Sequence, residues 1–350
     1  MTLPTRMRVA RLHAWGDVRV EDAPVPRPAE GEIVVRIDAC GVCGSDALVW
    51  YVESKAPAVL GHEPAGVIAA VGTGVSGLSE GDRVFVHHHA PCRACAECRR
   101  GLWSNCATWR ATRLDPGGFA EYARVPAVVV DCDTLPLPDG MDVVTATFIE
   151  PVACCLRAVK RQGRVGPEDS VHVVGLGAMG QVMAQLARIL GASRVTGSDF
   201  IAERRNLATR LGADAAFHPG ETDVPDALRS ANDGRGADVI IVCPGAAGAI
   251  QAGIATAAPG ARVVCFTPLH PSEALVLDQN ALYFREIALL QSYSCGPDET
   301  RAALDLLAGG KLRVDALVSH RTGLEGVAGA LERAHGKGDG LKTIILPGLT

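Results

Sequence analysis

The stretch Val171-His172-Val173-Val174-Gly175-Leu176-Gly177-Ala178-Met179-Gly180 decides the fold. It begins with a mostly apolar run typical of a buried strand and continues with glycines in the pattern G-x-G-x-x-G. Apolar residues then recur at helical spacing over residues 179–190. A strand, a glycine turn and a helix in succession predict one unit of a parallel sheet with helices on its faces.

The same alternation continues along the chain. Residues 194–198 form a second predicted strand before a helix at 201–211, and the runs 238–242 and 262–266 predict two more strands. We therefore expect a doubly wound parallel sheet in an α/β protein, beginning near residue 165, where the character of the sequence changes.

The glycine turn has the context of a dinucleotide-binding site, because a strand precedes it and Asp199 closes the next strand. Gly175 permits the tight turn, Gly177 lets the pyrophosphate approach the backbone, and Gly180 allows close helix packing. Asp199 would bind ribose hydroxyls and repel a 2′-phosphate, which favours NAD over NADP, although Arg204 and Arg205 slightly weaken this preference. The predicted cofactor contacts are Gly175, Leu176, Gly177, Ala178, Met179, Gly180, Asp199 and Arg204.

The remaining residues suggest a second domain, as the length of 350 residues also does. Residues 1–155 contain short β-type runs broken by Gly, Pro and Asp, and a closing strand is expected at 342–346. The net charge of −5, without a basic block, argues against nucleic acid as a partner. The absence of a long apolar run or signal sequence argues against a membrane and for the cytoplasm.

Four of the twelve cysteines lie close together in the segment 90–108. Cys92, Cys95, Cys98 and Cys106 follow the spacing C-x2-C-x2-C-x7-C, which suits one tetrahedral ion and is too cramped for two relaxed disulfides. Because all four ligands are thiolates, we expect a structural zinc; a reactive cysteine cluster is the alternative.

A second zinc site is predicted around Cys43, His62 and Glu63. Structural zinc sites fill every position with Cys or His, whereas catalytic sites mix ligand types and leave one position open. Asp46 would accept the other imidazole N–H of His62 and so fix its tautomer. Ser45, two residues after Cys43, can pass on a proton from a metal-bound alcohol. The mixed ligand set and this hydroxyl together predict a catalytic site.

The sequence does not decide which of two carboxylates is the third protein ligand of this zinc. Glu63 and Glu150 compete for it, and one of them would bind zinc directly while the other holds the metal-bound water. The run His87-His88-His89 follows a predicted strand, so alternate rings should point in opposite directions. We expect one or two of them to line the pocket or its wall, with a further metal as the less favoured reading.

These motifs resemble the zinc-dependent medium-chain alcohol and polyol dehydrogenases over essentially the whole chain. Gly61-His62-Glu63-Pro64-Ala65-Gly66 matches that family's zinc signature, and Cys43-Gly44-Ser45-Asp46 resembles its sorbitol and threonine dehydrogenase branch. The resemblance implies a GroES-like catalytic domain at 1–155, a Rossmann domain at 156–295, and a return to the first domain over 296–350. It also implies a homotetramer or homodimer. One departure is Leu48, where many relatives have the histidine that ends a proton relay.

The function implied is hydride transfer between NAD(H) and a secondary alcohol of a polyol, cyclitol or sugar, through a zinc alkoxide. Two zinc ions per chain are expected, one catalytic and one structural. A 3-hydroxy amino acid dehydrogenase of the threonine type is the alternative, because it uses the same apparatus. A zinc-free reductase is a further alternative, which metal content would separate from the zinc enzyme. A non-catalytic NAD-binding protein is the last alternative, and it would have no reason to keep the candidate zinc ligands, all of which are present.

Overall fold

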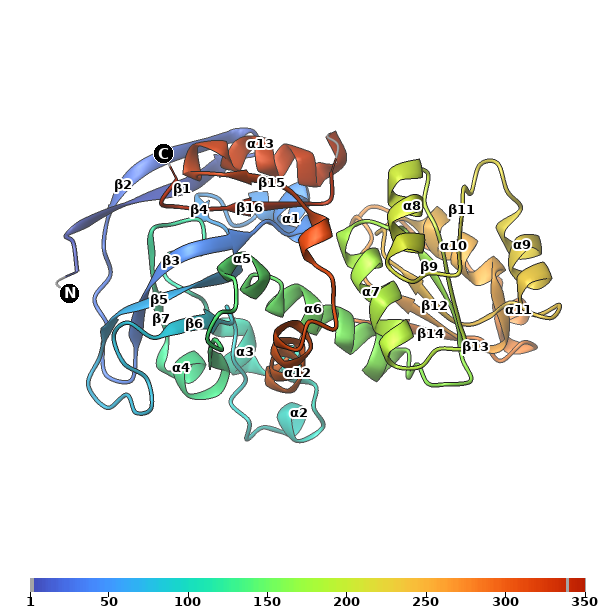
Figure 1. Ribbon diagram of the computed structural model, residues 1–350, viewed down its shortest axis with the longest axis horizontal. Helices are drawn as coiled ribbons and strands as arrows, with labels where there is room; N and C mark the ends of the chain where they lie inside the picture. Colours follow the sequence, from blue (N-terminus) through green and yellow to red (C-terminus); the bar gives the residue numbers. More distant parts are fainter. Residues whose placement is uncertain (1–2, 338–339, 350) are drawn as a thin grey trace. The chain divides into compact units, whose positions relative to one another are not determined.

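The computed structural model describes residues 3–337 and 340–349 and divides the chain into two compact units (Figure 1). The first unit comprises Met1–Ala153, Cys295–Gly310 and Val314–Thr350, and the second comprises Cys154–Ser294 and Lys311–Arg313. The short segment 311–313 joins the second unit because Arg313 donates its backbone N–H to Gln185 Oε1 at 2.9 Å. The predicted divisions after residues 155 and 295 lie close to the two main crossings.

The second unit is built on one six-stranded sheet in the order β11-β10-β9-β12-β13-β14. Every neighbouring pair in it is parallel, which confirms the predicted doubly wound sheet. Its strands are β9 (Ser170–Val174), β10 (Arg194–Ser198), β11 (Ala215–Phe217), β12 (Ala237–Val242), β13 (Ala257–Cys265) and β14 (Ala288–Gln291). Its helices are α7 (Ala178–Ile189), α8 (Ala202–Arg210), α9 (Val224–Ala231), α10 (Ala247–Ala255) and α11 (Gln279–Tyr283).

The first unit contains two sheets, a three-stranded one in the order β2-β1-β4 and a seven-stranded one. The larger runs β15-β16-β3-β5-β6-β8, with β7 paired to β3. The strands are β1 (Arg6–Ala14), β2 (Asp17–Pro24), β3 (Ile33–Gly41), β4 (Ala58–Val59), β5 (Glu63–Val71), β6 (Arg83–Val86), β7 (Tyr122–Val125), β8 (Thr134–Pro136), β15 (Val318–Thr322) and β16 (Lys342–Ile345).

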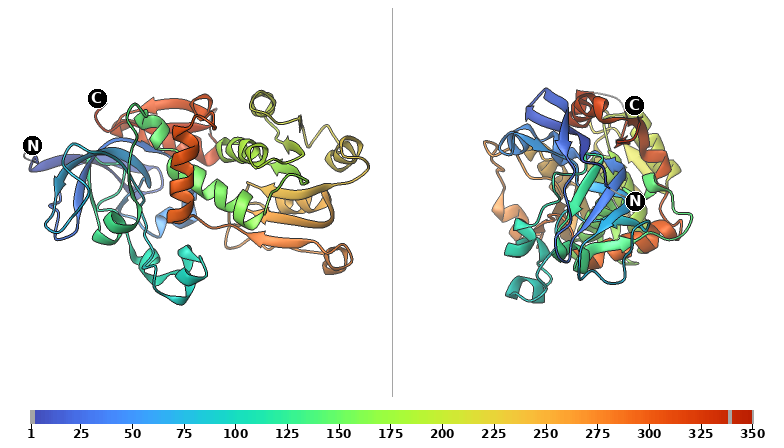
Figure 2. Two further views of the ribbon diagram at one scale, coloured as in Figure 1. Left: turned by 60° about the horizontal axis from the view of Figure 1, so that its bottom comes forward. Right: turned by 90° about the vertical axis from the view of Figure 1, so that its left-hand side faces the viewer.

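The helices of the first unit are short apart from α12. They are α1 (Val49–Glu53), α2 (Ala96–Arg99), α3 (Ala107–Ala111), α4 (Ala127–Asp133), α5 (Val143–Ala146), α12 (Pro297–Ala308) and α13 (Val327–Glu332); α6 (Ile149–Leu156) connects the two units along the chain. The loop carrying α2 projects away from the strands (Figure 2). Within the described residues, no helix has the length and apolar character needed to cross a membrane.

The return of the chain to the first unit matters for the site. Strand β16 pairs antiparallel with β3, matching Ile344 with Gly41. On its other side β3 pairs antiparallel with β5, matching Gly41 with Glu63. The end of β3, the start of β5 and the last strand of the chain are therefore neighbours in one sheet.

Candidate active site and metal centres

The pairing of β3 with β5 brings the two predicted catalytic motifs together. Cys43 follows the end of β3, and His62 immediately precedes β5, whose first residue, Glu63, is matched with Gly41. One ligand atom each from Cys43, His62 and Glu63 lies within 4.8 Å of the others. A thiol, an imidazole and a carboxylate thus converge on a volume that one ion would fill, as a mixed-ligand zinc site requires.

The imidazole of His62 is held on both sides. Its Nδ1 lies 3.2 Å from Asp46 Oδ1, and its Nε2 lies 3.5 Å from Ser45 Oγ. Asp46 is itself fixed, because its Oδ2 accepts the backbone N–H of Cys43 at 3.1 Å. Burial lowers the pKa of His62, but the neighbouring Asp46 carboxylate and Cys43 raise it overall to well above its usual value. Because Asp46 takes Nδ1, Nε2 is the nitrogen that would bind a metal.

Glu63 has a partner that the sequence reading missed. The Lys342 ammonium lies 2.7 Å from Glu63 Oε1 and 2.6 Å from Oε2, and both side chains are buried. Gly41 makes the room, since a Cβ there would stand 1.9 Å from Glu63 Oε2. Burial raises the pKa of Glu63, and the Lys342 charge opposes that rise. The available signal was a lysine at the start of an otherwise apolar closing strand.

Glu150, the competing carboxylate, lies in the first turn of α6 and is buried. One of its oxygens lies within 4.8 Å of ligand atoms of His87 and Cys295. Its charge also raises the pKa values of Glu63 and Lys342, so it is electrostatically linked to the first cluster. Cys295 is a second residue that the sequence reading did not single out.

The three consecutive histidines have different surroundings. His87 is buried, with Nδ1 2.8 Å from Asp133 Oδ2. The ring of His88 lies 4.9 Å from that of His62, measured between centroids. His89 donates from Nδ1 to the carbonyl oxygen of Thr112 at 2.7 Å. His88 is therefore the histidine beside His62, whereas His87 lies near Glu150 and His87 and His89 both have internal hydrogen-bond partners.

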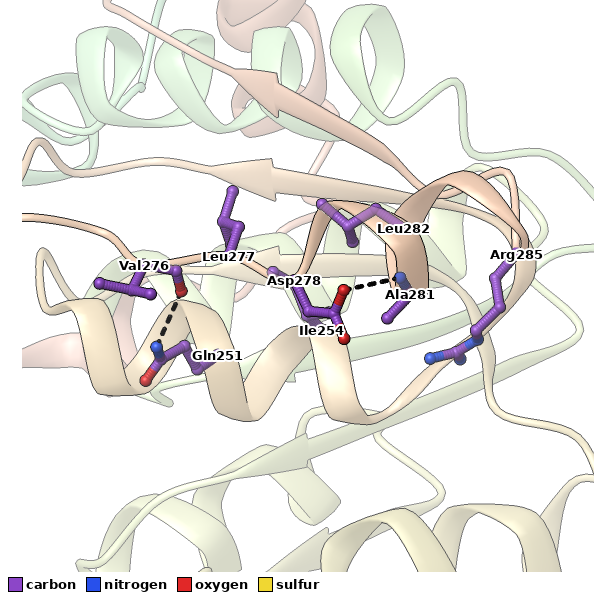
Figure 3. A pocket seen from close by; sticks show the side chains of 8 residues that line it. All are labelled: Gln251, Ile254, Val276, Leu277, Asp278, Ala281, Leu282 and Arg285. Atoms are coloured by element: carbon purple, nitrogen blue, oxygen red, sulfur yellow. Dashed lines mark hydrogen bonds between the residues drawn. The ribbon is translucent and has the colours of Figure 1, made fainter.

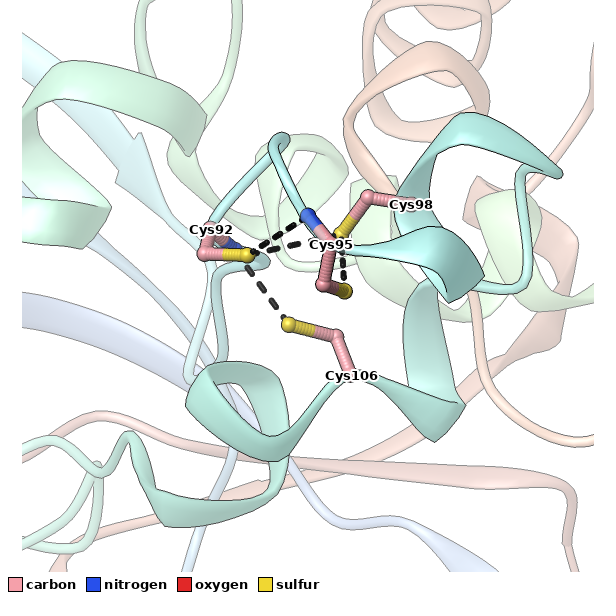
Figure 4. A group of neighbouring side chains, drawn as sticks. All are labelled: Cys92, Cys95, Cys98 and Cys106. Atoms are coloured by element: carbon pink, nitrogen blue, oxygen red, sulfur yellow. Dashed lines mark hydrogen bonds between the residues drawn. The ribbon is translucent and has the colours of Figure 1, made fainter.

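The four-cysteine segment also forms a compact cluster (Figure 4). The sulfurs of Cys92, Cys95, Cys98 and Cys106 all lie within 4.8 Å of one another. Cys95 and Cys98 are separated by 3.4 Å, and Cys92 and Cys98 by 3.9 Å, so neither pair is a disulfide. Four thiolates at about 2.3 Å from one zinc would be about 3.8 Å apart, which agrees with these separations.

Backbone N–H groups favour anionic sulfur at Cys92 and Cys106, whereas burial raises the pKa of Cys98 to about 12. Burial raises the pKa of Cys106, but N–H groups of Cys92 and Trp109 lower it overall to about 6. The N–H of Cys95 likewise points at Cys92 Sγ, 3.4 Å away. No ligand position remains for a substrate, so the donor set fits a structural ion.

In the second unit the glycine turn has the shape that a dinucleotide needs. Gly175 has φ of +84°, and a Cβ on Gly180 would stand 2.0 Å from the carbonyl oxygen of Gly175. A Cβ on Gly177 would meet nothing within 4 Å, so the start of α7 is open to a ligand. The residues between these glycines, Leu176, Ala178 and Met179, form the turn and the first residues of α7.

Asp199 is fixed beside this turn. Its Oδ2 accepts the N–H of Leu176 at 2.8 Å, its Oδ1 accepts the N–H of Ile201 at 2.9 Å, and Arg204 Nη1 lies 3.8 Å from Oδ2. The carboxylate is therefore oriented by backbone groups at the end of β10. Arg204 lies close enough to Asp199 to influence whether the site accepts a ribose with free hydroxyls or one that carries a 2′-phosphate.

Comparison with known proteins gives the family. Residues 29–139 match the alcohol dehydrogenase GroES-like domain, and residues 178–309 match the zinc-binding dehydrogenase domain. D-xylulose reductase A from Aspergillus oryzae is 30% identical over 341 residues, covering 94% of this chain and 93% of its own. L-threonine 3-dehydrogenase from Pyrococcus abyssi is 32% identical over 318 residues, covering 88% of each chain.

A solved structure extends the similarity to three dimensions. Galactitol-1-phosphate dehydrogenase from Escherichia coli is 29% identical, with a TM-score of 0.85 over 97% of this chain and all of its own. Sequence, motifs and fold agree over nearly the whole length. The chain belongs to the zinc-dependent medium-chain alcohol dehydrogenases, enzymes that transfer a hydride between an alcohol carbon and a nicotinamide cofactor.

Proposed function

We propose that this enzyme oxidises a secondary alcohol group of a polyol, cyclitol or sugar with NAD⁺. The observation that carries the proposal is the convergence of Cys43, His62 and Glu63 with the Ser45 hydroxyl beside His62. This arrangement combines a metal-binding set with a proton-accepting hydroxyl. The names of the D-xylulose and galactitol-1-phosphate relatives support a polyol or ketose substrate class.

Each residue has a defined task. Cys43 and His62 would hold the catalytic zinc, and Glu63 is favoured over Glu150 as the third ligand because it lies in the same cluster. When bound, zinc lowers the pKa of a coordinating hydroxyl group so that it can lose a proton near neutral pH. Asp46 keeps Nδ1 of His62 protonated, and Ser45 Oγ accepts and passes on the substrate proton.

The proton must leave the site without the usual histidine. Leu48 occupies that position and cannot carry a proton. The exit from Ser45 therefore runs through a cofactor ribose hydroxyl, water or Glu150. Cys92, Cys95, Cys98 and Cys106 would hold a structural zinc that orders their loop and takes no part in this transfer.

NAD is the proposed cofactor, with NADP less favoured. The open space at Gly177 would take the pyrophosphate at the start of α7. Asp199 would accept hydrogen bonds from the ribose hydroxyls and would repel a 2′-phosphate. Arg204, 3.8 Å from Asp199, reduces that repulsion and keeps the preference moderate.

A threonine-type activity is the second candidate, because the Pyrococcus relative carries that name at comparable identity. The two substrate classes differ in charge: a 3-hydroxy amino acid brings a carboxylate and an ammonium group, and a polyol brings only hydroxyls. An absorbance screen for NADH with polyols, cyclitols and L-threonine separates them. Turnover of polyols alone supports the proposal, turnover of threonine alone supports the alternative, and no turnover of either class contradicts both.

We also propose that the chain forms a homo-oligomer, a dimer or a tetramer, through the face around α11 (Figure 3). A groove of about 180 Å³ is lined there by residues of α10 and of the segment 276–285. Val276 is 74%, Tyr283 66% and Phe284 81% exposed, and β14 is the last strand of its sheet. Exposed apolar side chains beside a strand edge favour association. Phe284→Ser should shift the mass measured by light scattering toward the monomer, and an unchanged mass would contradict this interface.

A cytoplasmic location is proposed on the state of the cysteines. All twelve are free of disulfides, including the four that cluster in the loop. Reducing compartments keep thiols in this state.

A further inference from the structure

One buried amide in the second unit bonds to both the glycine turn and the helix that follows it. Gln181 lies near the start of α7 and is fully buried, among residues that are mostly apolar. Its Nε2 donates one hydrogen bond to the carbonyl oxygen of Leu176 at 2.9 Å and another to that of Arg204 at 2.8 Å. Both amide hydrogens are therefore used, and they join the glycine turn to α8.

The oxygen of the same amide makes Gln181 an expensive choice for a core position. Its Oε1 is buried and accepts no hydrogen bond from the residues that the structure describes. A buried acceptor without a donor destabilises a protein, and an unbranched methionine would fill similar space without that penalty. Residues that break a packing rule in this way are typical of functional sites. The two hydrogen bonds from Nε2 are thus expected to hold something that matters.

The backbone of Leu176 is the first group that Gln181 holds. Its carbonyl oxygen accepts from Gln181, and its N–H donates to Asp199 Oδ2 at 2.8 Å. The Leu176 side chain is fixed as well, because it is fully buried and lies only 2.6 Å from where a Cβ on Gly197 would stand. The proposed ribose acceptor, Asp199, is therefore aligned by a residue that Gln181 restrains.

Arg204 is the second group that Gln181 holds. It lies in α8, and its Nη1 is 3.8 Å from Asp199 Oδ2. The hydrogen bond from Gln181 to the Arg204 carbonyl oxygen ties this part of α8 to α7. The contacts close a ring within the second unit, in which Gln181 is linked to Asp199 through Leu176 and to Arg204 directly.

We propose that Gln181 is a positioning residue that sets the cofactor preference, because it holds Asp199 and Arg204 in the arrangement that accepts free ribose hydroxyls. The inference rests on the proposed function, in which these two side chains face the adenosine ribose. Without the amide, the Leu176 backbone loses a restraint and α8 no longer fixes Arg204. Binding of NADH should then weaken more than binding of NADPH, since the released arginine can approach a 2′-phosphate.

Fluorescence titration of the full-length chain with NADH and with NADPH tests the proposal without a substrate. Gln181→Met keeps an unbranched side chain of similar length but has no donor. Its Kd for NADH should rise about tenfold, as the loss of one or two hydrogen bonds would produce, and its Kd for NADPH by about threefold at most. The ratio of the two Kd values should therefore shift toward NADPH by about threefold or more.

Gln185→Met is the matched control. Gln185 is a buried glutamine one turn further along α7, and its amide bonds to the backbone of Arg313 instead of the glycine turn. This variant should lose a similar amount of thermal stability and keep the wild-type ratio of Kd values. The same ratio in Gln181→Met and Gln185→Met would overturn the proposal, since a merely structural amide behaves in this way. Gln181→Leu also lacks a donor and gives the same test if the methionine variant folds poorly.

A double variant shows whether Gln181 acts through Asp199. In the Asp199→Asn background the ribose contact is already altered, so Gln181→Met should change the ratio of Kd values by less than about twofold. A full shift in that background would contradict the ring of contacts. Failure of the proposed function gives a different result: a wild-type preference for NADPH would contradict the proposed cofactor, while a ratio moved by Gln181→Met and not by Gln185→Met would still support the ring.

Discussion

The four-cysteine loop and the Cys43 cluster are both candidate metal-binding groups of one unit, but they are assembled differently. In the loop, all ligands lie between Cys92 and Cys106 and resemble one another. In the Cys43 cluster, ligands of different kinds are brought together by the pairing of β3 with β5, and Lys342 arrives on β16. A local set of like ligands favours a closed structural ion, whereas an open, mixed set built from a sheet can serve chemistry.

Cys43→Ala removes a candidate ligand from the catalytic cluster and should have the largest effect of the variants predicted here. The thiolate that would hold the catalytic zinc is removed, so turnover should fall by about 10³-fold or more, equal to about 4 kcal/mol or more of barrier. NAD binding, measured by fluorescence titration, should survive because the glycine turn lies in the other unit. Cys265→Ala is the control with normal turnover. Activity near that of the wild type in Cys43→Ala would contradict the proposed site.

Cys106→Ser removes one thiolate from the four-cysteine loop and tests the structural role of that loop. Loss of one thiolate should release the loop zinc, and the loop should lose the folding free energy that the metal supplies, of the order of several kcal/mol. The expected readouts are one fewer zinc per chain and a lower midpoint of thermal unfolding. Turnover per folded chain at low temperature should fall much less than in Cys43→Ala. Equal loss of turnover in both variants would show that the two sites are not separable.

Lys342→Met tests a feature that the four-cysteine loop lacks, namely a buried charged partner that a distant strand supplies to Glu63. With no metal in the catalytic cluster, the substitution leaves the Glu63 carboxylate buried without its ammonium, which should cost about 3 kcal/mol of unfolding free energy. Glu63→Gln alone and the double variant complete a cycle measured by urea unfolding. If the ion pair is responsible, the double variant should be more stable than the sum of the two single losses predicts. Strict additivity would contradict the coupling.

These differences set what could be predicted from the sequence. The four loop cysteines lie close together in sequence, so their spacing alone predicted that they form a cluster, and the glycine turn with its flanking strand and helix indicated the parallel sheet. Cys43 and His62 were found because their short motifs are distinctive. Lys342 lies 279 residues from Glu63, and only the pairing of β16 with β3 brings them together. Asp133 and Cys295 were missed beside His87 for the same reason.

Asp199→Asn should have the smallest effect, and it tests the cofactor preference of the second unit. Asn keeps one oxygen that can accept the Leu176 N–H, so the turn should hold its shape, but the hydrogen bond from the Ile201 N–H and the negative charge are lost. The KM for NAD⁺ should rise about tenfold, equal to about 1.4 kcal/mol, while use of NADP⁺ improves because repulsion of the 2′-phosphate disappears. Steady-state kinetics with both cofactors measure the change, and Arg204→Ala provides the opposite perturbation. If Asp199→Asn left the NAD⁺ to NADP⁺ ratio of kcat/KM unchanged, cofactor preference would have to come from other groups. Zinc content should stay the same in both variants, since neither residue belongs to a metal cluster of the first unit.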